Sequence, residues 1–146
     1  MRGNRRDWVL ARQVVNLTKI RWAVKNFHPY KSPGMDGIFP ALLQQGLDLF
    51  ASTLCTLLRA SIALGYIPMV WRDVKVVFIP KPGRDSYAQA KSFRPISLTS
   101  FLLKLLEKLI ERHIRDEVLG LDPISKYQCA YQPGRSCELA IHRVVE

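Results

Sequence analysis

Lys81 and Arg94 stand at the two ends of a loop whose composition suits an anionic ligand. Six basic and two acidic residues lie between positions 72 and 94. Arginine offers phosphate a planar fork and lysine offers a point charge, so the two side chains could grip one phosphate group from two sides. We expect both side chains to point into solvent. The alternative is a solvated loop without a ligand, because runs of charge are often only exposed faces.

Two stretches with the composition of β-strands flank this loop. Residues 74–79 are β-branched or aromatic on both alternating faces, which predicts a strand buried on at least one side. Residues 93–98 form the returning strand, and Pro95 places it at an edge or a bulge because proline has no N–H to donate. Pro82 and Gly83 supply the turn. The pattern predicts a hairpin, and its connection of about a dozen residues has the length of a functional loop.

Apolar residues at helical spacing precede the hairpin in two stretches. The first covers 16–27 and ends at His28, which a following proline excludes from the α region. The second covers 42–64 and ends at Gly65, a residue suited to a left-handed C-cap. Gly46 could divide this second stretch into two helices.

Two further helices are expected after the hairpin. Thr99 or Ser100 can cap the first, which runs to about Leu119 with its leucines, Ile110 and Ile114 turned inward. Ser136 can cap the last helix, over 138–146. The first of these helices is interpreted as scaffold.

Two loops combine turn signals with polar side chains. Residues 31–38 contain Pro-Gly and Asp-Gly and begin with Lys31, so this segment is either a functional loop or a stiff connector in which Asp36 is a local cap. Residues 126–136 mix aromatic, amide and basic side chains around another Pro-Gly turn. Such a mixture suits stacking and backbone contacts to an extended nucleic acid.

The composition favours a polyanionic partner inside the cell. The net charge is +10 over 146 residues, with 48% hydrophobic residues, which is enough for one domain or a piece of one. We identify no apolar run of membrane-spanning length and no apolar signal core, so nucleic acid is preferred over a membrane surface.

Three cysteines, Cys55, Cys129 and Cys137, are expected to be free thiols, because their number is odd and the compartment is expected to be reducing. A zinc site from Cys129, Cys137 and His142 is disfavoured, since no C-x-x-C pair exists and a fourth ligand is missing.

Four motifs in order, KSPGMDGI (31–38), WRDVKVVFIPKPGR (71–84), FRPISLTSFLLKLLEKLIER (93–112) and QCAYQPGRS (128–136), resemble the reverse transcriptases of non-LTR retrotransposons. The resemblance covers 14–146 and leaves 1–13 as a basic N-terminal segment. It implies an α+β fold, the helix-rich fingers subdomain of a polymerase right hand. In such a fold the hairpin, over about 74–98, packs on helices, and most of the palm is absent.

The resemblance also implies roles for individual residues. Lys81 and Arg94 would contact the triphosphate of the incoming deoxynucleotide. Other residues would contact the RNA template or the RNA/DNA hybrid, and these are Lys31, Arg84, Lys91, Gln128, Arg135 and Ser136.

The aspartates that hold catalytic metal in this family belong to downstream motifs, so we expect no catalytic residue and no metal ligand in this chain. Mg²⁺ or Mn²⁺ would act only in the full-length enzyme. The palm and thumb would be the partners of this chain within that enzyme. The expected locations are the cytoplasm and the nucleus. An alternative is a stand-alone or decayed nucleic-acid-binding module without enzymatic activity. A helical scaffold that ignores nucleic acid fits the charge of +10 least well.

Overall fold

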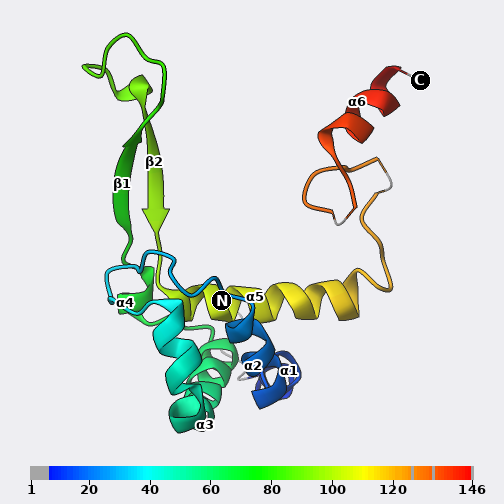
Figure 1. Ribbon diagram of the computed structural model, residues 1–146. Helices are drawn as coiled ribbons and strands as arrows, with labels where there is room; N and C mark the ends of the chain where they lie inside the picture. The colour runs from blue at the N-terminus through cyan, green and yellow to red at the C-terminus, as the bar shows by residue number, and fades with distance from the viewer. Residues whose placement is uncertain (1–6, 126, 133, 146) are drawn as a thin grey trace, which may run out of the picture. The chain divides into compact units, whose positions relative to one another are not determined.

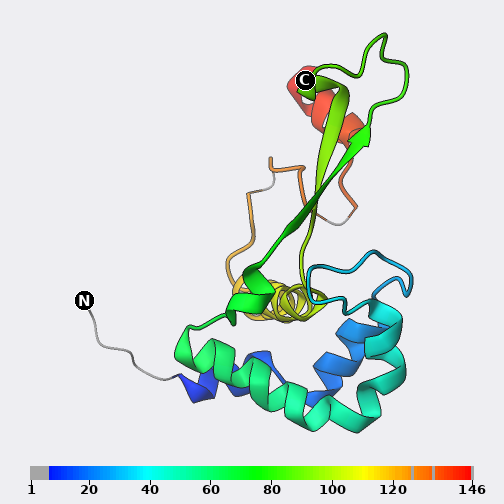
Figure 2. The same ribbon diagram turned by 90° about the vertical axis from the view of Figure 1, so that its left-hand side faces the viewer.

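The computed structural model describes residues 7–125, 127–132 and 134–145. The chain divides into two compact units, Met1–Glu111 and Arg112–Glu146, and each is considered by itself. Figures 1 and 2 show the helices and strands of both units.

Three helices form the base of the first unit, and Figure 1 shows α1 (Trp8–Val14) and α2 (Leu17–Lys25) beside α3 (Pro40–Leu64). Their apolar faces meet in one core. Its fully buried side chains include Ile20, Val24 and Leu58. Burial of these faces, rather than helix propensity, is the main source of stability for helices of this length.

Helix α1 lies where the sequence predicted only a basic N-terminal segment over 1–13. Asp7 caps it, since its Oδ1 accepts a hydrogen bond of 2.9 Å from the Leu10 N–H. Ala11 and Val14 are buried in the first unit. The expected boundary at 13/14 falls inside this helix, which packs against α3. Residues 1–6 of that segment lie outside the described residues.

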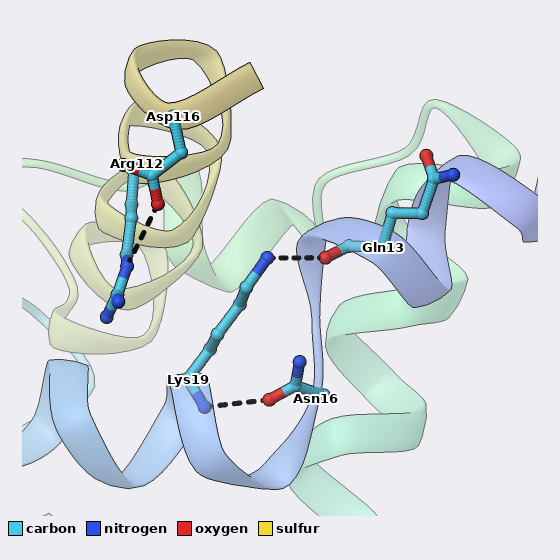
Figure 3. A network of polar contacts seen from close by, with 5 residues as sticks. All are labelled: Gln13, Asn16, Lys19, Arg112 and Asp116. Carbon is cyan, nitrogen blue, oxygen red and sulfur yellow. Dashed lines mark hydrogen bonds and ion pairs between the residues drawn. The ribbon is translucent and has the colours of Figure 1, made fainter. Parts of the chain in front are cut away.

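Helix α2 confirms the predicted helix over 16–27, although it is shorter at its end. Asn16 is its N-cap, with Oδ1 accepting from the Lys19 N–H at 2.8 Å. Figure 3 shows that the Lys19 side chain also reaches back, donating from Nζ to the Gln13 carbonyl at 2.6 Å. Lys19 therefore joins the start of α2 to the end of α1.

Helix α3 is continuous, so the suggestion that Gly46 divides it is wrong. Leu43 and Leu47, on either side of the glycine, are both buried, and this packing outweighs the lower helix propensity of one glycine. The Phe50 ring covers the position where a Gly46 side chain would stand. Gly65 ends the helix in the left-handed conformation, with φ 60°, as predicted.

Among the described residues, α3 alone is long and apolar enough to cross a membrane, so the expectation that no apolar run reaches that length is wrong. Core helices of water-soluble proteins meet the same criteria of length and composition. In this protein α3 packs against α1 and α2, and ten of its residues are buried.

The predicted hairpin is present as β1 (Lys75–Pro80) and β2 (Phe93–Leu98), an antiparallel pair reached through the short helix α4 (Met69–Arg72). The bounds of β2 are those predicted, and β1 begins and ends one residue later than expected. Every residue of β1 is exposed, so the prediction of a strand buried on one side, in a hairpin packed on helices, is wrong along this strand. Figures 1 and 2 show the hairpin projecting from the helices of the first unit.

The two prolines within the strands, Pro80 and Pro95, occupy positions where the sheet loses no backbone hydrogen bond. The Lys81 N–H donates to the Ser92 carbonyl at 2.8 Å, so the pair 81/92 continues the register as a hydrogen-bonded pair. Hydrogen-bonded pairs alternate with non-bonded ones, which puts Pro80 and Pro95 in non-bonded pairs with their nitrogens facing outward. The prediction that Pro95 lies on an edge strand is confirmed, since the sheet has two strands.

Helix α5 (Phe101–His113) follows β2 and continues as a π-helical turn, η2 (Ile114–Val118). Of the two predicted caps, Ser100 is used, because its Oγ accepts from the Leu102 N–H at 3.1 Å. The α-helix ends before the predicted Leu119. Wider π turns shift side chains off the apolar stripe, and Ile114, which was expected to face inward, is 43% exposed.

The second unit contains a loop and helix α6 (Cys137–Val145). At the start of this unit, Arg112 Nε at the end of α5 and Asp116 Oδ2 in η2 form an ion pair at 3.4 Å, drawn in Figure 3. Ser136 caps α6 as predicted, with Oγ accepting from the Leu139 N–H at 3.2 Å.

The three cysteines are free, Cys55 in the buried core and Cys137 at the surface.

The loop over 31–38 is the compact turn that the sequence predicted. The Gly37 N–H donates to the Gly34 carbonyl at 3.3 Å, and Asp36 Oδ1 accepts from the Ile38 N–H at 3.1 Å. A Cβ placed on Gly34 would stand 2.8 Å from the backbone nitrogen of Ser100 and 2.8 Å from the carbonyl carbon of Thr99. The loop is thus held against the chain that leaves β2.

Gly34→Ala should lower the free energy of unfolding by about 1–3 kcal/mol, because backbone must move to admit the methyl group. Urea unfolding followed by tryptophan fluorescence measures this change. Ser32→Ala, at an exposed position of the same loop, is the matched control. Equal midpoints for the two variants would contradict the close approach of Gly34 to residues 99 and 100.

Candidate nucleotide and nucleic-acid interface

Lys81 and Arg94 lie on one face of the hairpin. Arg94 is paired with Ile79, and the continued register pairs Lys81 with Ser92. Side chains two residues apart on a strand share a face, so Lys81 and Arg94 are diagonal cross-strand neighbours, a relation that places Cβ atoms about 7 Å apart. The prediction that these two cations flank one position at the mouth of the loop agrees with this register.

The tip loop, residues 81–92, is closed by hydrogen bonds from both of its ends. Lys81 Nζ donates to the Lys91 carbonyl at 2.8 Å, and Tyr87 Oη donates to the Lys81 carbonyl at 2.9 Å. Lys81 is half-buried, which corrects the expectation that its side chain points into solvent, whereas Arg94 is exposed as expected. To reach a phosphate, the Lys81 ammonium must exchange its bond to the Lys91 carbonyl for one to the ligand.

Ser92 also stabilises the tip loop, from its position at the end of the short helix η1 (Ala90–Ser92). The Ser92 side chain is only 2% exposed, and its Oγ donates to the Ser86 carbonyl at 2.6 Å. The Tyr87 ring packs edge-on against Phe93, with 5.9 Å between centroids. The loop is therefore an ordered lobe with its own internal contacts.

Tyr87 and Ser92 were missed by the sequence analysis, although both help to hold Lys81. No signal in the sequence indicates these two residues, because hydroxyl-bearing side chains in a loop do not follow the periodic pattern of a helix or a strand. Only the pairing of Lys81 with Ser92 brings the two ends of the loop close enough for these bonds.

The other basic candidates of the first unit divide between the two ends of the hairpin. Arg84 and Lys91 are exposed on the tip loop, near Lys81 in sequence. Lys31 is exposed at the opposite end, where it lines a hollow together with Ile96 and Leu98 of β2. Ile96 in turn lies two residues from Arg94 on β2, on the same face of the strand.

In the second unit the predicted contacts lie around the turn before α6. Gln128 is exposed and donates from Nε2 to the Ala130 carbonyl at 3.5 Å. Arg135 is half-buried, and the Ser136 hydroxyl is engaged in capping α6. Tyr131, not singled out from sequence, is 99% exposed and has φ 58°, an uncommon conformation for a bulky residue. Lys126 and Pro133 of this segment lie outside the described residues.

The acidic residues present do not fit a two-metal centre. Asp36 accepts a bond within its own turn, while Asp48 and Asp116 are paired with Arg21 and Arg112. Across the described parts of the chain, no three side chains of the metal-binding types gather in one place.

No family model matches the chain. Curated relatives do match most of it. The chain is 28% identical over 132 residues to the probable RNA-directed DNA polymerase from transposon BS of Drosophila melanogaster, covering 90% of this chain and 14% of that protein. It is 35% identical over 119 residues to the probable RNA-directed DNA polymerase from transposon X-element of the same species, covering 80% of this chain and 13% of that protein.

A third relative extends the match to another type of element. The retrovirus-related Pol polyprotein from type-1 retrotransposable element R1 of Bradysia coprophila is 24% identical over 124 residues, covering 85% of this chain and 12% of that protein. The chain is homologous to part of the RNA-directed DNA polymerases of non-LTR retrotransposons. The chain spans less than one sixth of the length of these relatives, 12–14%. The resemblance inferred from the four motifs is confirmed.

Tyr87→Phe should loosen the tip loop without removing the ring contact to Phe93. Loss of one hydrogen bond of about 0.5–1.5 kcal/mol should speed hydrogen exchange of the Lys81 amide by up to about tenfold. Exchange measured by NMR, with Tyr30→Phe at a position 91% exposed as control, tests this. Unchanged exchange at Lys81 would show that Tyr87 does not brace the loop.

Proposed function

We propose that this chain is the nucleotide- and template-binding part of the RNA-directed DNA polymerase of a non-LTR retrotransposon. The observation that carries the proposal is the placement of Lys81 and Arg94 on one face of the hairpin, as diagonal neighbours beside an ordered loop. In this proposal both side chains hold the triphosphate of the incoming deoxynucleotide.

The chemistry of the two cations suits a triphosphate. Its negative charge is concentrated on neighbouring phosphoryl groups, and its transfer depends more on positioning and charge stabilisation than on covalent participation by the protein. The Arg94 guanidinium can bind two oxygens at once, and the Lys81 ammonium can bind one from a loop that is already ordered. Little conformational entropy remains to be lost at the backbone of this loop.

The remaining basic and polar candidates are proposed to contact the RNA template or the RNA/DNA hybrid. They are Lys31, Arg84 and Lys91 in the first unit, and Gln128, Arg135 and Ser136 in the second. The net charge of +10 supports a contact with polyphosphate backbone that is salt-dependent and nearly independent of sequence.

We infer that catalysis requires the palm and thumb of the whole polymerase, with divalent ions held there. Such ions activate the attacking hydroxyl and stabilise the leaving pyrophosphate when bound. The residues of this chain would supply binding and orientation of the nucleotide and template.

Lys81→Ala and Arg94→Ala should each weaken binding of a deoxynucleoside triphosphate to this chain about tenfold, since a charge-assisted contact of about 1.5–3 kcal/mol is lost. Isothermal titration calorimetry measures the affinity. Lys75→Ala is the matched control, because Lys75 is on the same face of the hairpin but six residues, about 20 Å, from Lys81. If all three variants bind equally well, the hairpin is not a triphosphate site.

The chain alone should not extend a primer. A primed RNA template, the four deoxynucleotides and either Mg²⁺ or Mn²⁺ would be incubated with the 146-residue chain and, in parallel, with an active reverse transcriptase. We expect extension only with the active enzyme, because the acidic side chains described here are not gathered into a metal site. Extension by the chain itself, well above a buffer control, would disprove the proposed division of roles.

A further inference from the structure

A hollow lies at the base of the hairpin, and one of its lining residues, Ile96, is two residues from Arg94 on β2. It is formed by the end of α2, the loop after it, the end of β2 and the start of α5, all within the first unit. Its volume is about 490 Å³, within the range of sites that hold small molecules. None of the described residues that line it is acidic.

The rim of the hollow is basic on two sides. Lys31 is exposed on the loop that Gly34 holds against residues 99 and 100, so its backbone position is fixed relative to α5. Lys104 lies across the hollow on the first turns of α5. The two lysines thus come from segments far apart in the sequence.

Lys104 is held in place by an aromatic ring rather than by a carboxylate. Its Nζ lies 4.3 Å from the centroid of the Phe101 ring. One turn further along α5, Lys108 Nζ lies 5.3 Å from the Phe27 centroid and 5.4 Å from that of Trp22. Neither lysine takes part in an ion pair among the described residues.

This arrangement orders the ammonium groups without neutralising them. A ring face attracts a cation but keeps its charge available to a further anion. Two lysines at i and i+4 repel one another, so Lys104 and Lys108 do not favour the isolated helix. A row of oriented and unneutralised cations is suited to consecutive phosphates.

The wall of the hollow is apolar. Ile96 is 39% exposed, and it stands beside the half-buried Leu98 and Phe27. A planar base could cover these side chains and remove apolar surface from water, while its phosphates stay at the basic rim. A double helix would offer its phosphates but not the face of a base.

We propose that this hollow binds single-stranded nucleic acid, with Lys31 and Lys104 holding backbone phosphates, Lys108 the next phosphate along, and one unpaired base against Ile96 and Leu98. The proposal rests on the proposed function, since it names a site for the strand that this segment contacts. Lys104 and Lys108 are added to the residues implied by sequence.

The test measures binding of a fluorescent single-stranded oligouridylate to the 146-residue chain at several salt concentrations. Lys104→Gln should weaken binding about tenfold at low salt. It should also make the slope of log affinity against log salt less negative by about 0.7, the value for one phosphate contact to a single strand. Lys31→Gln should have the same two effects.

Arg12→Gln is the matched control, because it removes one exposed positive charge from α1, outside the hollow. Lys104→Arg keeps both the charge and a ring contact and should bind as the unaltered chain does. Circular dichroism and urea midpoints show whether each variant is folded. If Lys104→Gln misfolds, Lys31→Gln, at an exposed loop position, provides the measurement instead.

The outcomes separate the two proposals. If Lys104→Gln and Lys31→Gln both show the same affinity and salt slope as Arg12→Gln, the hollow is not a binding site. The proposed function would remain in place. No salt-dependent binding by the unaltered chain would overturn both.

The base contact has its own readout. A strand of the same length without bases should bind the unaltered chain more weakly than oligouridylate does, and Ile96→Ser should reduce that difference. Equal binding of both strands to the unaltered chain would overturn the apolar wall as a base contact.

Discussion

The backbone pairing of β1 with β2 is the interaction on which the proposed interface depends. All of β1 is exposed, so the hairpin is not held in register by a buried face on that strand. It is held instead by the backbone pairing of the two strands, by the continuation of that pairing through Lys81 and Ser92, and by the hydrogen bonds within the tip loop. A slip of one residue would move Lys81 and Arg94 to opposite faces, because side chains alternate along a strand. Placement of the two cations is thus a property of the main chain.

Much of this architecture could be predicted from local sequence signals. The bounds of β2, the caps at Ser100 and Ser136, and the left-handed Gly65 each follow from the chemistry of one or two residues. Strong local preferences of this kind survive in most tertiary contexts. The hairpin, its turn and the positions of its two end cations were predictable for the same reason.

The errors concern burial and long-range packing. The apolar residues of β1 suggested a covered strand, yet nothing in a strand's own composition determines whether another layer lies over it. Gly46 suggested a break, but burial of Leu43 and Leu47 on the same helix outweighs the preference of one glycine. Helix α1 was missed because the arginines of residues 1–13 led that stretch to be interpreted as a basic segment, although five of the seven residues of α1 are apolar. The braces at Tyr87 and Ser92, and the hollow that joins Lys31 to Lys104, arise from contacts between segments distant in sequence.

The outward-facing nitrogens of Pro80 and Pro95 have a consequence for solubility. A two-stranded sheet has two open edges, and exposed apolar strands such as β1 are templates for edge-to-edge aggregation. A neighbouring chain that added a strand to either edge would find no N–H donor at the proline on that edge, and would meet a rigid ring there instead. The hairpin can therefore leave apolar side chains such as Phe78, 64% exposed, uncovered with less risk of strand addition by other copies.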